Sequence, residues 1–220
     1  MKKTVIITGG TSLIAEETVK LLKDWNVYPC SRTHDNYIDV TDPQSVEAMI
    51  DIVLCKESSI DAVVNLAGGF QIKTNFLDTH PEKFKQVMDL NFYGAVNMTR
   101  AALPHLMVNG GSIVNIVSRA AMTGFPKCAS YSAAKAALLV FTRTIAQEYA
   151  EHNVRANCIL PGFTASKRND GVPQNALPKS PLNRHTTPID VANMIKFLLS
   201  NEADHITGAC MDLSGGVALH

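Results

Sequence analysis

The sequence predicts an α/β fold in which helices cover both faces of a parallel β-sheet, and three observations support this prediction. Short apolar runs alternate with longer helical patterns along the chain, as in repeated βαβ units. The short runs are apolar at nearly every position, which is typical of strands buried on both faces. The chain of 220 residues has 46% hydrophobic residues and no repeat or low-complexity tract that would divide it. We therefore expect one domain that spans residues 1–220.

Six apolar runs are the expected strands. Each has the length of a strand, and most are followed by a residue typical of turns. They cover residues 4–8, 27–30, 60–66, 112–117, 154–160 and 209–213.

Helices are expected between these strands. Asp42 and Pro43 form a favourable N-cap and first-turn pair, and the apolar residues after them recur at helical spacing. Thr187 and Pro188 repeat this arrangement before a second amphipathic helix. Two longer helices are expected at residues 79–107 and 130–151.

Two connections differ from the rest. Only six residues separate Arg32 from Asp39, whereas a crossover between parallel strands needs about a dozen, so this connection is shortened. By contrast, residues 162–187 form a long irregular stretch with three prolines. Connections of this length in a compact domain are usually functional, and we interpret this one as a substrate loop.

Composition excludes several classes of function. The 20 basic and 20 acidic residues balance, and a pI near 7.0 leaves no basic field that would attract nucleic acid or anionic lipid. No apolar run reaches the roughly 18 to 20 residues of a membrane helix. The seven histidines include no pair at ligand spacing, so we expect no metal site. The five cysteines lack a C-x-x-C pair and indicate reduced thiols in a cytoplasmic protein.

A glycine-containing turn follows the first expected strand and opens a helix. Gly9 allows a tight turn, and backbone N–H groups at the start of a helix favour the pyrophosphate of a dinucleotide. Leu13 stands where such a turn usually has a second glycine, which lets the pyrophosphate approach. An ordinary strand-to-helix turn is therefore an alternative. The candidate binding residues of the turn are Gly9, Thr11, Ser12, Leu13 and Ile14.

A second pattern predicts proton transfer. Tyr131 and Lys135 lie four residues apart on an expected helix and so share one face, and Ser118 lies thirteen residues before Tyr131 at the end of an expected strand. An ammonium beside a phenol favours the phenolate, so we expect Lys135 to lower the pKa of Tyr131 from about 10. Tyr131 would then serve as an acid and a base near neutral pH. A solvated helix face with the same spacing is the alternative.

These residues belong to a longer ordered set. The set runs Thr8-Gly9, Asn65-Leu66-Ala67-Gly68, Asn91, Ser118, Tyr131 with Lys135, Pro161-Gly162 and Asp212-Leu213-Ser214-Gly215-Gly216. In this order, and over essentially the whole chain, it resembles the short-chain dehydrogenase/reductase family, with some similarity to the dihydropteridine-reductase-like and ketoacyl-reductase-like branches. The resemblance implies a doubly wound, Rossmann-type sheet, a nicotinamide cofactor, and hydride transfer between that cofactor and a carbonyl or alcohol.

The resemblance also implies roles for single residues. Tyr131 would exchange a proton with the substrate oxygen, Ser118 would hold that oxygen, and Lys135 would grip the nicotinamide ribose. Asn91 would hold a water that links Lys135 to solvent, and Asn65 would brace the sheet under the cofactor. The other residues expected at the nicotinamide half are Ala67, Gly68, Pro161, Gly162 and Thr164.

The end of the second strand decides the predicted cofactor. Arg32 offers a fork of donors and Ser31 a hydroxyl to a ribose 2′-phosphate, whereas an acidic residue there would indicate NAD. We therefore predict NADP(H), with NAD as the second choice. Asp39 and Val40 resemble the family's adenine-contacting pair. Two departures from the family, Leu13 and the absence of a helix between Arg32 and Asp39, both affect the half of the site that would hold the adenine and the pyrophosphate. The alternative is therefore a catalytically weak or inactive scaffold that senses a cofactor or binds a protein.

The sequence says less about substrate and assembly. Met122, Phe125 and Phe163 would give a mainly apolar pocket for a small carbonyl or alcohol. Arg119 directly follows Ser118 and could meet an anionic group, or it could face solvent or an acidic partner. The resemblance implies a homo-oligomer, a tetramer or a dimer, formed through the two long helices and the C-terminal segment.

Overall fold

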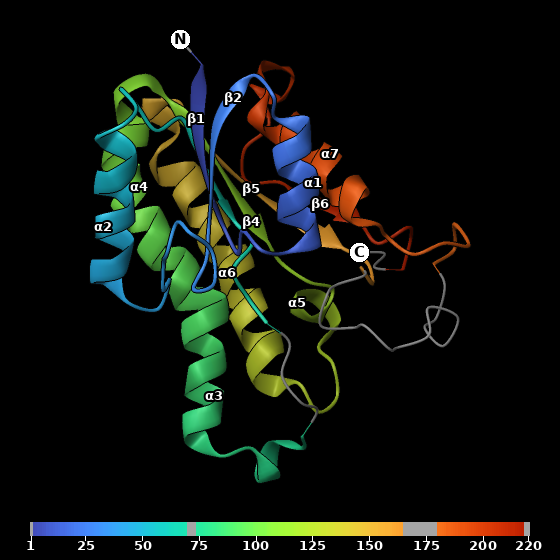
Figure 1. Cartoon of the computed structure of the whole chain (residues 1–220). Helices are drawn as coiled ribbons and strands as arrows, with labels where there is room; N and C mark the ends of the chain where they lie inside the picture. The colour runs from blue at the N-terminus through green and yellow to red at the C-terminus, as the bar shows by residue number, and fades with distance from the viewer. Residues whose placement is uncertain (1, 70–73, 165–179, 218–220) are drawn as a thin grey trace.

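Six strands form one sheet at the centre of the computed structural model, which describes residues 2–69, 74–164 and 180–217 (Figure 1). The strands are β1 (Lys3–Thr8), β2 (Trp25–Cys30), β3 (Ala62–Asn65), β4 (Gly111–Ile116), β5 (Val154–Pro161) and β6 (Cys210–Leu213). Their order is β2-β1-β3-β4-β5-β6, and every neighbouring pair is parallel. Each lies within two residues of a predicted strand, so the predicted parallel α/β fold is confirmed.

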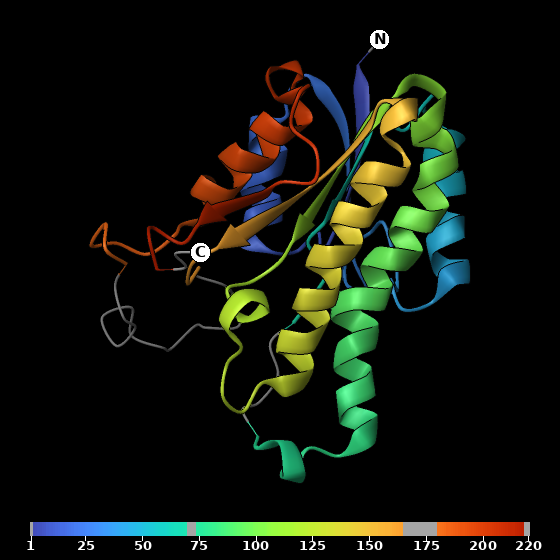
Figure 2. The ribbon, with the colours of Figure 1, turned by 180° about the vertical axis from the view of Figure 1, so that it is seen from behind.

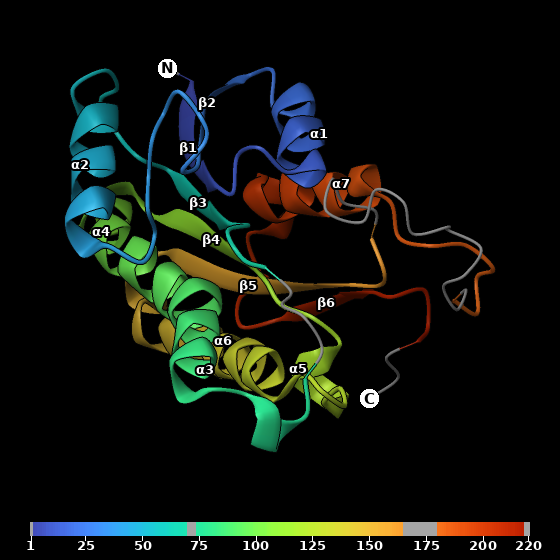
Figure 3. The same ribbon diagram turned by 60° about the horizontal axis from the view of Figure 1, so that its bottom comes forward.

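Helices cover both faces of the sheet (Figures 2 and 3). The long ones are α1 (Leu13–Leu21), α2 (Pro43–Leu54), α4 (Gly94–Asn109), α6 (Ala129–Glu148) and α7 (Pro188–Leu199). Val5 and Ile7 of β1 pack in a buried cluster with α1 and α7, whereas Ile6 between them packs in another with α2 and α4. This alternation explains why the strands are apolar at every position. Within the described residues, no helix is long and apolar enough to cross a membrane.

The two predicted helix starts are confirmed by their caps. Asp42 accepts a hydrogen bond from the Gln44 N–H (3.1 Å) at the start of α2, and Pro43 occupies the first turn. At the start of α7, Thr187 and Asp190 form a reciprocal capping box. Both devices satisfy N–H groups that the helix itself leaves without a partner.

The helix predicted at residues 79–107 is confirmed as an unbroken helical run over residues 81–109, but this run contains a π turn that the sequence did not predict. A π-helical turn, Asp89–Tyr93, joins α3 (Pro81–Met88) to α4. A π turn adds one residue to the helical repeat and leaves the stretch apolar, so the hydrophobic periodicity does not reveal it. Turns of this kind are frequent at functional sites, and this one contains the buried Asn91.

Residues 31–42, all of them described, form no helix, as their short length predicts. Ser31 pairs with Tyr37 in an isolated parallel bridge, and the Ser31 N–H donates to the Asn36 carbonyl (3.2 Å). The Asn36 side chain donates in turn to the Pro29 carbonyl (3.1 Å). In the strand order, β2 lies at the edge of the sheet. From β1 the chain first adds β2 on one side and then β3 on the other, so the strand order reverses between β1 and β3. In open α/β sheets, such a reversal marks the ligand crevice.

The long connection after β5 is described only at its two ends, residues 162–164 and 180–187. Residues 165–179, most of the predicted substrate loop, lie outside the described residues, so this prediction stays a prediction. At the base of the connection, Thr164 and Thr186 pair in a parallel bridge. This bridge holds the two ends of the connection together.

Candidate active site

The carboxyl ends of the parallel strands meet at one edge of the sheet (Figures 1 and 3). Thr8, Asn65 and Asn115, at or near the ends of β1, β3 and β4, pair in register. Ser118 lies two residues beyond β4, and Pro161 ends β5. Side chains from distant parts of the sequence are therefore collected at this edge, where ligands bind in open α/β sheets.

Ser118, Tyr131 and Lys135 converge there. Tyr131 and Lys135 lie one turn apart on α6, and the Lys135 Nζ is 5.9 Å from the centroid of the Tyr131 ring. A side-chain hydrogen bond joins Ser118 to Tyr131. Ser118 Oγ also accepts a bond from the Ala120 N–H (3.2 Å), at the start of the short helix α5 (Ala120–Thr123). The structure thus brings together three of the four residues predicted to be catalytic.

The pKa of Tyr131 is raised, so the predicted lowering by Lys135 is wrong. Burial is the largest cause, because it disfavours the charged phenolate. The hydrogen bond with Ser118 opposes this effect, and the Cys128 thiol adds to it. The sequence argument counted only the charge of Lys135 and could not weigh burial. As a consequence, Tyr131 holds its proton at neutral pH.

Lys135 is almost completely buried, with 5% of its surface exposed. Its ammonium donates to the Ile116 carbonyl (2.8 Å) at the end of β4. Burial lowers the pKa of Lys135 to about 8, because the charged form loses its hydration. Lys135 is therefore mostly charged at pH 7 and loses its charge just above it. Titratable groups shifted in this way are concentrated at functional sites.

Asn91 is the fourth residue predicted to be catalytic, and its side chain binds backbone groups. Asn91 Oδ1 accepts from the Gly69 N–H (3.0 Å), while Nδ2 donates to the carbonyls of Gly69 (3.1 Å) and Val87 (3.0 Å). A Cβ on Gly68 would lie 2.9 Å from Asn91 Oδ1 and 3.5 Å from Lys135 Nζ. Asn91 therefore holds the chain after β3 close to Lys135, and only glycine fits at position 68. The predicted water-holding role stays a prediction.

The glycine-containing turn after β1 packs tightly between the ends of two strands. Gly9 has a φ of +70°, and a Cβ there would lie 2.9 Å from the Ala67 backbone nitrogen. A Cβ on Gly10 would lie 2.6 Å from the Cys30 nitrogen. These glycines thus serve the packing of the turn against β3 and β2. The exposed Thr11 completes the turn.

Helix α1 begins directly after this turn. Ser12 is its N-cap, and Ser12 Oγ accepts from the Ala15 N–H (3.2 Å). The first N–H groups of a helix have no partner inside the helix, so those of Leu13 and Ile14 stay available to an anion. Ala15 is fully buried against the sheet, which is the packing role expected at that position.

Asn65 lies at the base of the site and links the sheet to α6. Its Nδ2 donates to Asn115 Oδ1 (2.8 Å), and Asn115 Nδ2 donates to Thr142 Oγ1 (2.8 Å) on α6. These contacts agree with the predicted bracing of the sheet. Among the described residues, Asn65 Oδ1 has no hydrogen-bond partner although it is buried. Beside it, the Ala67 N–H donates to Thr8 Oγ1 (3.1 Å).

The opposite end of the site is more exposed. Ser31 Oγ accepts from the Thr33 N–H (3.2 Å), and the Arg32 side chain faces solvent. Burial raises the pKa of Asp39, but hydrogen bonds from Thr41 and the charge of Arg32 outweigh it and leave that pKa lowered. Arg32 and Asp39 therefore lie near each other.

Val40, the neighbour of Asp39, is buried against the start of α4. Its carbonyl accepts from Asn97 Nδ2 (3.0 Å), and a Cβ on Gly94 would lie 2.6 Å from Val40 Cγ2. This contact joins the connection after β2 to α4.

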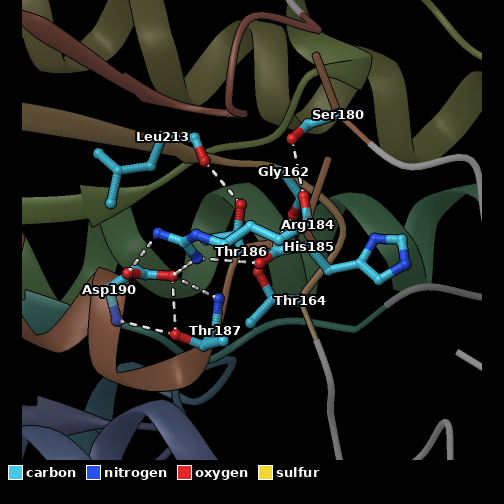
Figure 4. A network of polar contacts seen from close by, with 9 residues as sticks. All are labelled: Gly162, Thr164, Ser180, Arg184, His185, Thr186, Thr187, Asp190 and Leu213. Atoms are coloured by element: carbon cyan, nitrogen blue, oxygen red, sulfur yellow. Dashed lines mark hydrogen bonds and ion pairs between the residues drawn. The ribbon is translucent and has the colours of Figure 1, made fainter. Parts of the chain in front are cut away.

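Pro161, Gly162 and Thr164 lie at the other side of the site, after β5. Thr164 Oγ1 donates to the Gly162 carbonyl (3.1 Å), and the Gly162 N–H donates to the Leu213 carbonyl (3.3 Å). Thr186 Oγ1 donates to the same Leu213 carbonyl (2.6 Å), as Figure 4 shows. A Cβ on Gly162 would lie 2.6 Å from Thr186 Oγ1, so position 162 requires glycine.

An ion pair fixes the chain just before α7. Arg184 contacts Asp190 through two bonds, of 2.5 and 3.0 Å (Figure 4). The Arg184 guanidinium holds the pKa of Asp190 well below its usual range. Sequence reasoning missed this pair, because a spacing of six residues outside a helix has no regular meaning. It also missed two backbone contacts: that of Asn91 with Gly69 and that of Lys135 with the Ile116 carbonyl. The only signal for either was the Gly68-Gly69 doublet, since glycine often marks a close approach of the backbone.

Relatives of known activity share this chain over nearly its full length. A family model described as Enoyl-(Acyl carrier protein) reductase matches residues 14–218. A 3-oxoacyl-[acyl-carrier-protein] reductase of Thermotoga maritima is 32% identical and aligns with 97% of this chain and 87% of its own. This chain belongs to the short-chain dehydrogenase/reductase family. As a member of that family it is an NAD(P)-dependent oxidoreductase.

Other members of the family differ in the substrates that their names state. The 3alpha-hydroxysteroid dehydrogenase of Mediterraneibacter gnavus is 30% identical over 96% of this chain and 85% of its own. Among solved structures, ElxO with NADP bound has a TM-score of 0.90 and 28% identity over 98% of both chains. The 3-ketoacyl-(acyl-carrier-protein) reductase of Brucella melitensis complexed with NADH has a TM-score of 0.91 and 26% identity, covering 99% of this chain and 98% of its own. The Rossmann-type fold of this short-chain dehydrogenase/reductase is thus shown.

Proposed function

We propose that this protein transfers a hydride between NADP(H) and a small carbonyl or alcohol substrate, with Tyr131 as the general acid and base. The observation that carries the proposal is the convergence of Ser118, Tyr131 and Lys135 at the carboxyl edge of the sheet. The named relatives, which act on carbonyl and alcohol groups, support the same reaction class.

Tyr131 would act as the acid when a carbonyl is reduced. Its raised pKa keeps the phenol protonated near neutral pH, so the proton is present before the reaction starts. As the substrate oxygen becomes negative, the O–H bond of Tyr131 breaks and the proton moves to that oxygen. Ser118 would donate a hydrogen bond to the same oxygen. In alcohol oxidation, the proton moves in the opposite direction.

Lys135 would stabilise the phenolate that this transfer leaves on Tyr131. With a pKa of about 8, its ammonium is mostly charged at pH 7. An ammonium has three donors, and one of them is bonded to the Ile116 carbonyl. The other two would serve Tyr131 and the nicotinamide ribose. Asn91 is a positioning residue, since it holds Gly69 beside Lys135.

The chain has features that fit a dinucleotide. The N–H groups of Leu13 and Ile14 at the start of α1 suit a pyrophosphate, and the buried Asn65 Oδ1 and the missing Cβ of Gly68 suit a cofactor packed on the sheet edge. When bound, the nicotinamide supplies or receives the hydride. The residues that would hold the cofactor are Gly9, Thr11, Ser12, Leu13, Ile14, Ser31, Arg32, Asp39, Val40, Asn65, Ala67, Gly68, Tyr131, Lys135, Pro161, Gly162 and Thr164.

The preference for NADP(H) over NAD(H) rests on Ser31 and Arg32. Structural relatives were solved with either dinucleotide, so the fold does not decide between them. Arg32 is exposed at the end of β2, where its planar fork can meet a 2′-phosphate. Asp39 lies seven residues further on, where it accepts hydrogen bonds from Thr41 in its own turn and is close enough to Arg32 to feel its charge.

The same helices that carry the site offer a surface for assembly, and we infer a homo-oligomer. An open groove of about 300 Å³ lies between α4 and α6. The groove is lined by Val96, Thr99, Arg100, Leu103, Pro104, Met107, Phe141, Ile145 and Tyr149. A mostly apolar groove on two long helices fits the expected contact with a second copy. Multi-angle light scattering will give the mass of the assembly, and a monomer would contradict this inference.

A titration with NADPH and, separately, NADH tests the proposed function. Nicotinamide fluorescence and energy transfer from Trp25 report binding. We expect tight NADPH binding, weak NADH binding, and oxidation of NADPH in the presence of simple ketones or aldehydes. Absence of binding of either dinucleotide at millimolar concentration would favour the scaffold alternative instead.

A further inference from the structure

Arg119 lies between the serine of the proposed site and the short helix α5. Its guanidinium Cζ is 4.9 Å from the centroid of the Phe125 ring, within the range of a cation–π contact. The Phe125 N–H donates to Ser132 Oγ (3.2 Å), and Ser132 directly follows Tyr131 on α6. The Arg119–Phe125 stack therefore connects the Ser118 loop to the start of α6. It lies beside the two residues that would contact the substrate oxygen.

Arg119 and Arg155 are buried to a similar degree but differ in their hydrogen bonds. Among the arginines that the structure describes, only Arg119 and Arg155 are half-buried. Arg155 donates to the carbonyls of Leu198 (2.8 Å) and Ile206 (3.3 Å). For Arg119, the part of the chain that the structure describes supplies no carboxylate and no hydrogen-bond acceptor. The ion-paired alternative from the sequence is thus absent among these residues, and Arg119 is only partly exposed to solvent.

This arrangement orients a cation without neutralising it. The ring of Phe125 packs against the guanidinium, whose N–H donors have no acceptor among the described residues. A planar fork of donors matches two oxygens of a carboxylate or phosphate. Partial burial makes donors that have no acceptor costly, so an anion that supplies acceptors is favoured.

Two exposed apolar side chains lie on segments that follow β4 and β5 at the carboxyl edge of the sheet. Met122 on α5 is 37% exposed, and Phe163 after Gly162 is 49% exposed. Large apolar side chains left open near the end of β5 and on α5 suit the hydrocarbon part of a ligand.

We propose that Arg119 determines substrate specificity by binding an anionic group, a carboxylate or a phosphate, on the carbonyl substrate. This inference rests on the proposed function, because it assigns the substrate class of the same site. The preferred substrate is then a ketone or aldehyde with an apolar segment and an oxyanion at its far end. The neutral ester of the same compound is a poorer substrate.

Matched substrates test the assignment. Methyl ketones with a carboxylate at increasing distance from the carbonyl are each compared with their methyl esters, and dihydroxyacetone phosphate is compared with dihydroxyacetone. NADPH oxidation is measured for the wild type, Arg119→Met, Arg119→Lys and Arg143→Met. Arg143 is an exposed arginine on α6, eight residues and roughly 12 Å beyond Lys135, so its variant controls for the loss of one positive charge.

We expect Arg119→Met to lower kcat/KM by about 10- to 100-fold for one class of anionic substrate, mainly through KM. The neutral partners should change by less than about threefold, Arg119→Lys should recover part of the loss, and Arg143→Met should change neither. The carboxylate and phosphate series show which anion the site takes.

Two results would overturn the role of Arg119: equal losses for charged and neutral substrates, which indicate a structural role, or no loss for either. NADPH binding is measured alongside. If the wild type binds NADPH and oxidises it with none of these carbonyls, the proposed function itself fails, whereas turnover without discrimination removes only the role of Arg119.

Discussion

The two halves of the proposed site are built in different ways. Around Lys135, the groups are buried and joined by a dense set of bonds that includes Asn91, the Gly68-Gly69 backbone and the end of β4. Around Arg32, the connection is a short turn without a helix, and the Arg32 side chain faces solvent. The comparison indicates that proton transfer needs fixed positions, whereas recognition of a nucleotide tolerates changes in length and in single residues.

The largest expected effect lies in the buried half. Tyr131→Phe removes the hydroxyl, and with it the transferable proton and the hydrogen bond with Ser118, so kcat should fall by about 10²- to 10⁴-fold. The dissociation constant for NADPH should stay within about threefold of the wild type, because the ring remains in place. Stopped-flow NADPH oxidation and the Trp25 titration measure the two quantities. Tyr149→Phe, at the other end of α6, is the matched control, and retained turnover in Tyr131→Phe would refute the mechanism.

A second effect concerns the exposed half. Arg32→Ala should weaken NADPH binding by about 10- to 100-fold and leave NADH binding unchanged, because only NADPH has the 2′-phosphate. Parallel titrations of both dinucleotides check this, with exposed Lys56→Ala as a control elsewhere on the surface. Equal loss for NADH and NADPH would mean that Arg32 supports the turn rather than the phosphate.

Lys135 allows the comparison to be made in stability as well as in activity. Its pKa is lowered from 10.5 to about 8 by folding, so at pH 7 the charged side chain destabilises the native state. Lys135→Met should therefore abolish efficient turnover while it raises the free energy of unfolding at pH 7 by about 1–2 kcal/mol.

The pH dependence gives the sign of this effect. Between the folded pKa, about 8, and the unfolded value of 10.5, the unfolded chain binds more protons at this site than the native chain does. Stability of the wild type should therefore rise through this interval relative to Lys135→Met, so the advantage of the variant at pH 7 should shrink as the pH rises above 8. Urea unfolding at several pH values measures it, with exposed Lys196→Met on α7 as the control. A less stable Lys135→Met at pH 7 would mean that the bond to Ile116 outweighs burial.

The smallest effect is expected at Leu13. Leu13→Gly restores the glycine usual in dinucleotide turns, so NADPH affinity should rise by several-fold if the side chain obstructs the pyrophosphate. An unchanged affinity would show that the turn already accommodates Leu13. The same titration measures it, and circular dichroism checks that α1 still forms.

The sequence predicts most of the fold and the buried half of the site for a simple reason. Both depend on regular repeats: the four-residue helical spacing that puts Lys135 beside Tyr131, and the apolar strands whose register aligns Asn65 with Asn115. Features that depend on context were missed. The π turn around Asn91 inserts one residue without a change of composition, and the raised pKa of Tyr131 depends on burial.

Arg119 illustrates a third kind of limit. The sequence left open whether it meets solvent, an acidic partner or a ligand, since nothing in the chain order shows which side chains surround it. Only the fold shows its stack on Phe125 and the lack of an acceptor among the described residues.

The bridge between Thr164 and Thr186 has a consequence for protein engineering. Together with the Arg184–Asp190 pair, it closes the base of the connection between β5 and α7. The entropy of closing a loop grows only slowly with its length. A change in the length of the segment between its two described ends should therefore cost little in loop-closure entropy. If residues 165–179 form the substrate loop that the sequence predicts, replacing this one contiguous stretch of the gene is the direct way to change substrate preference.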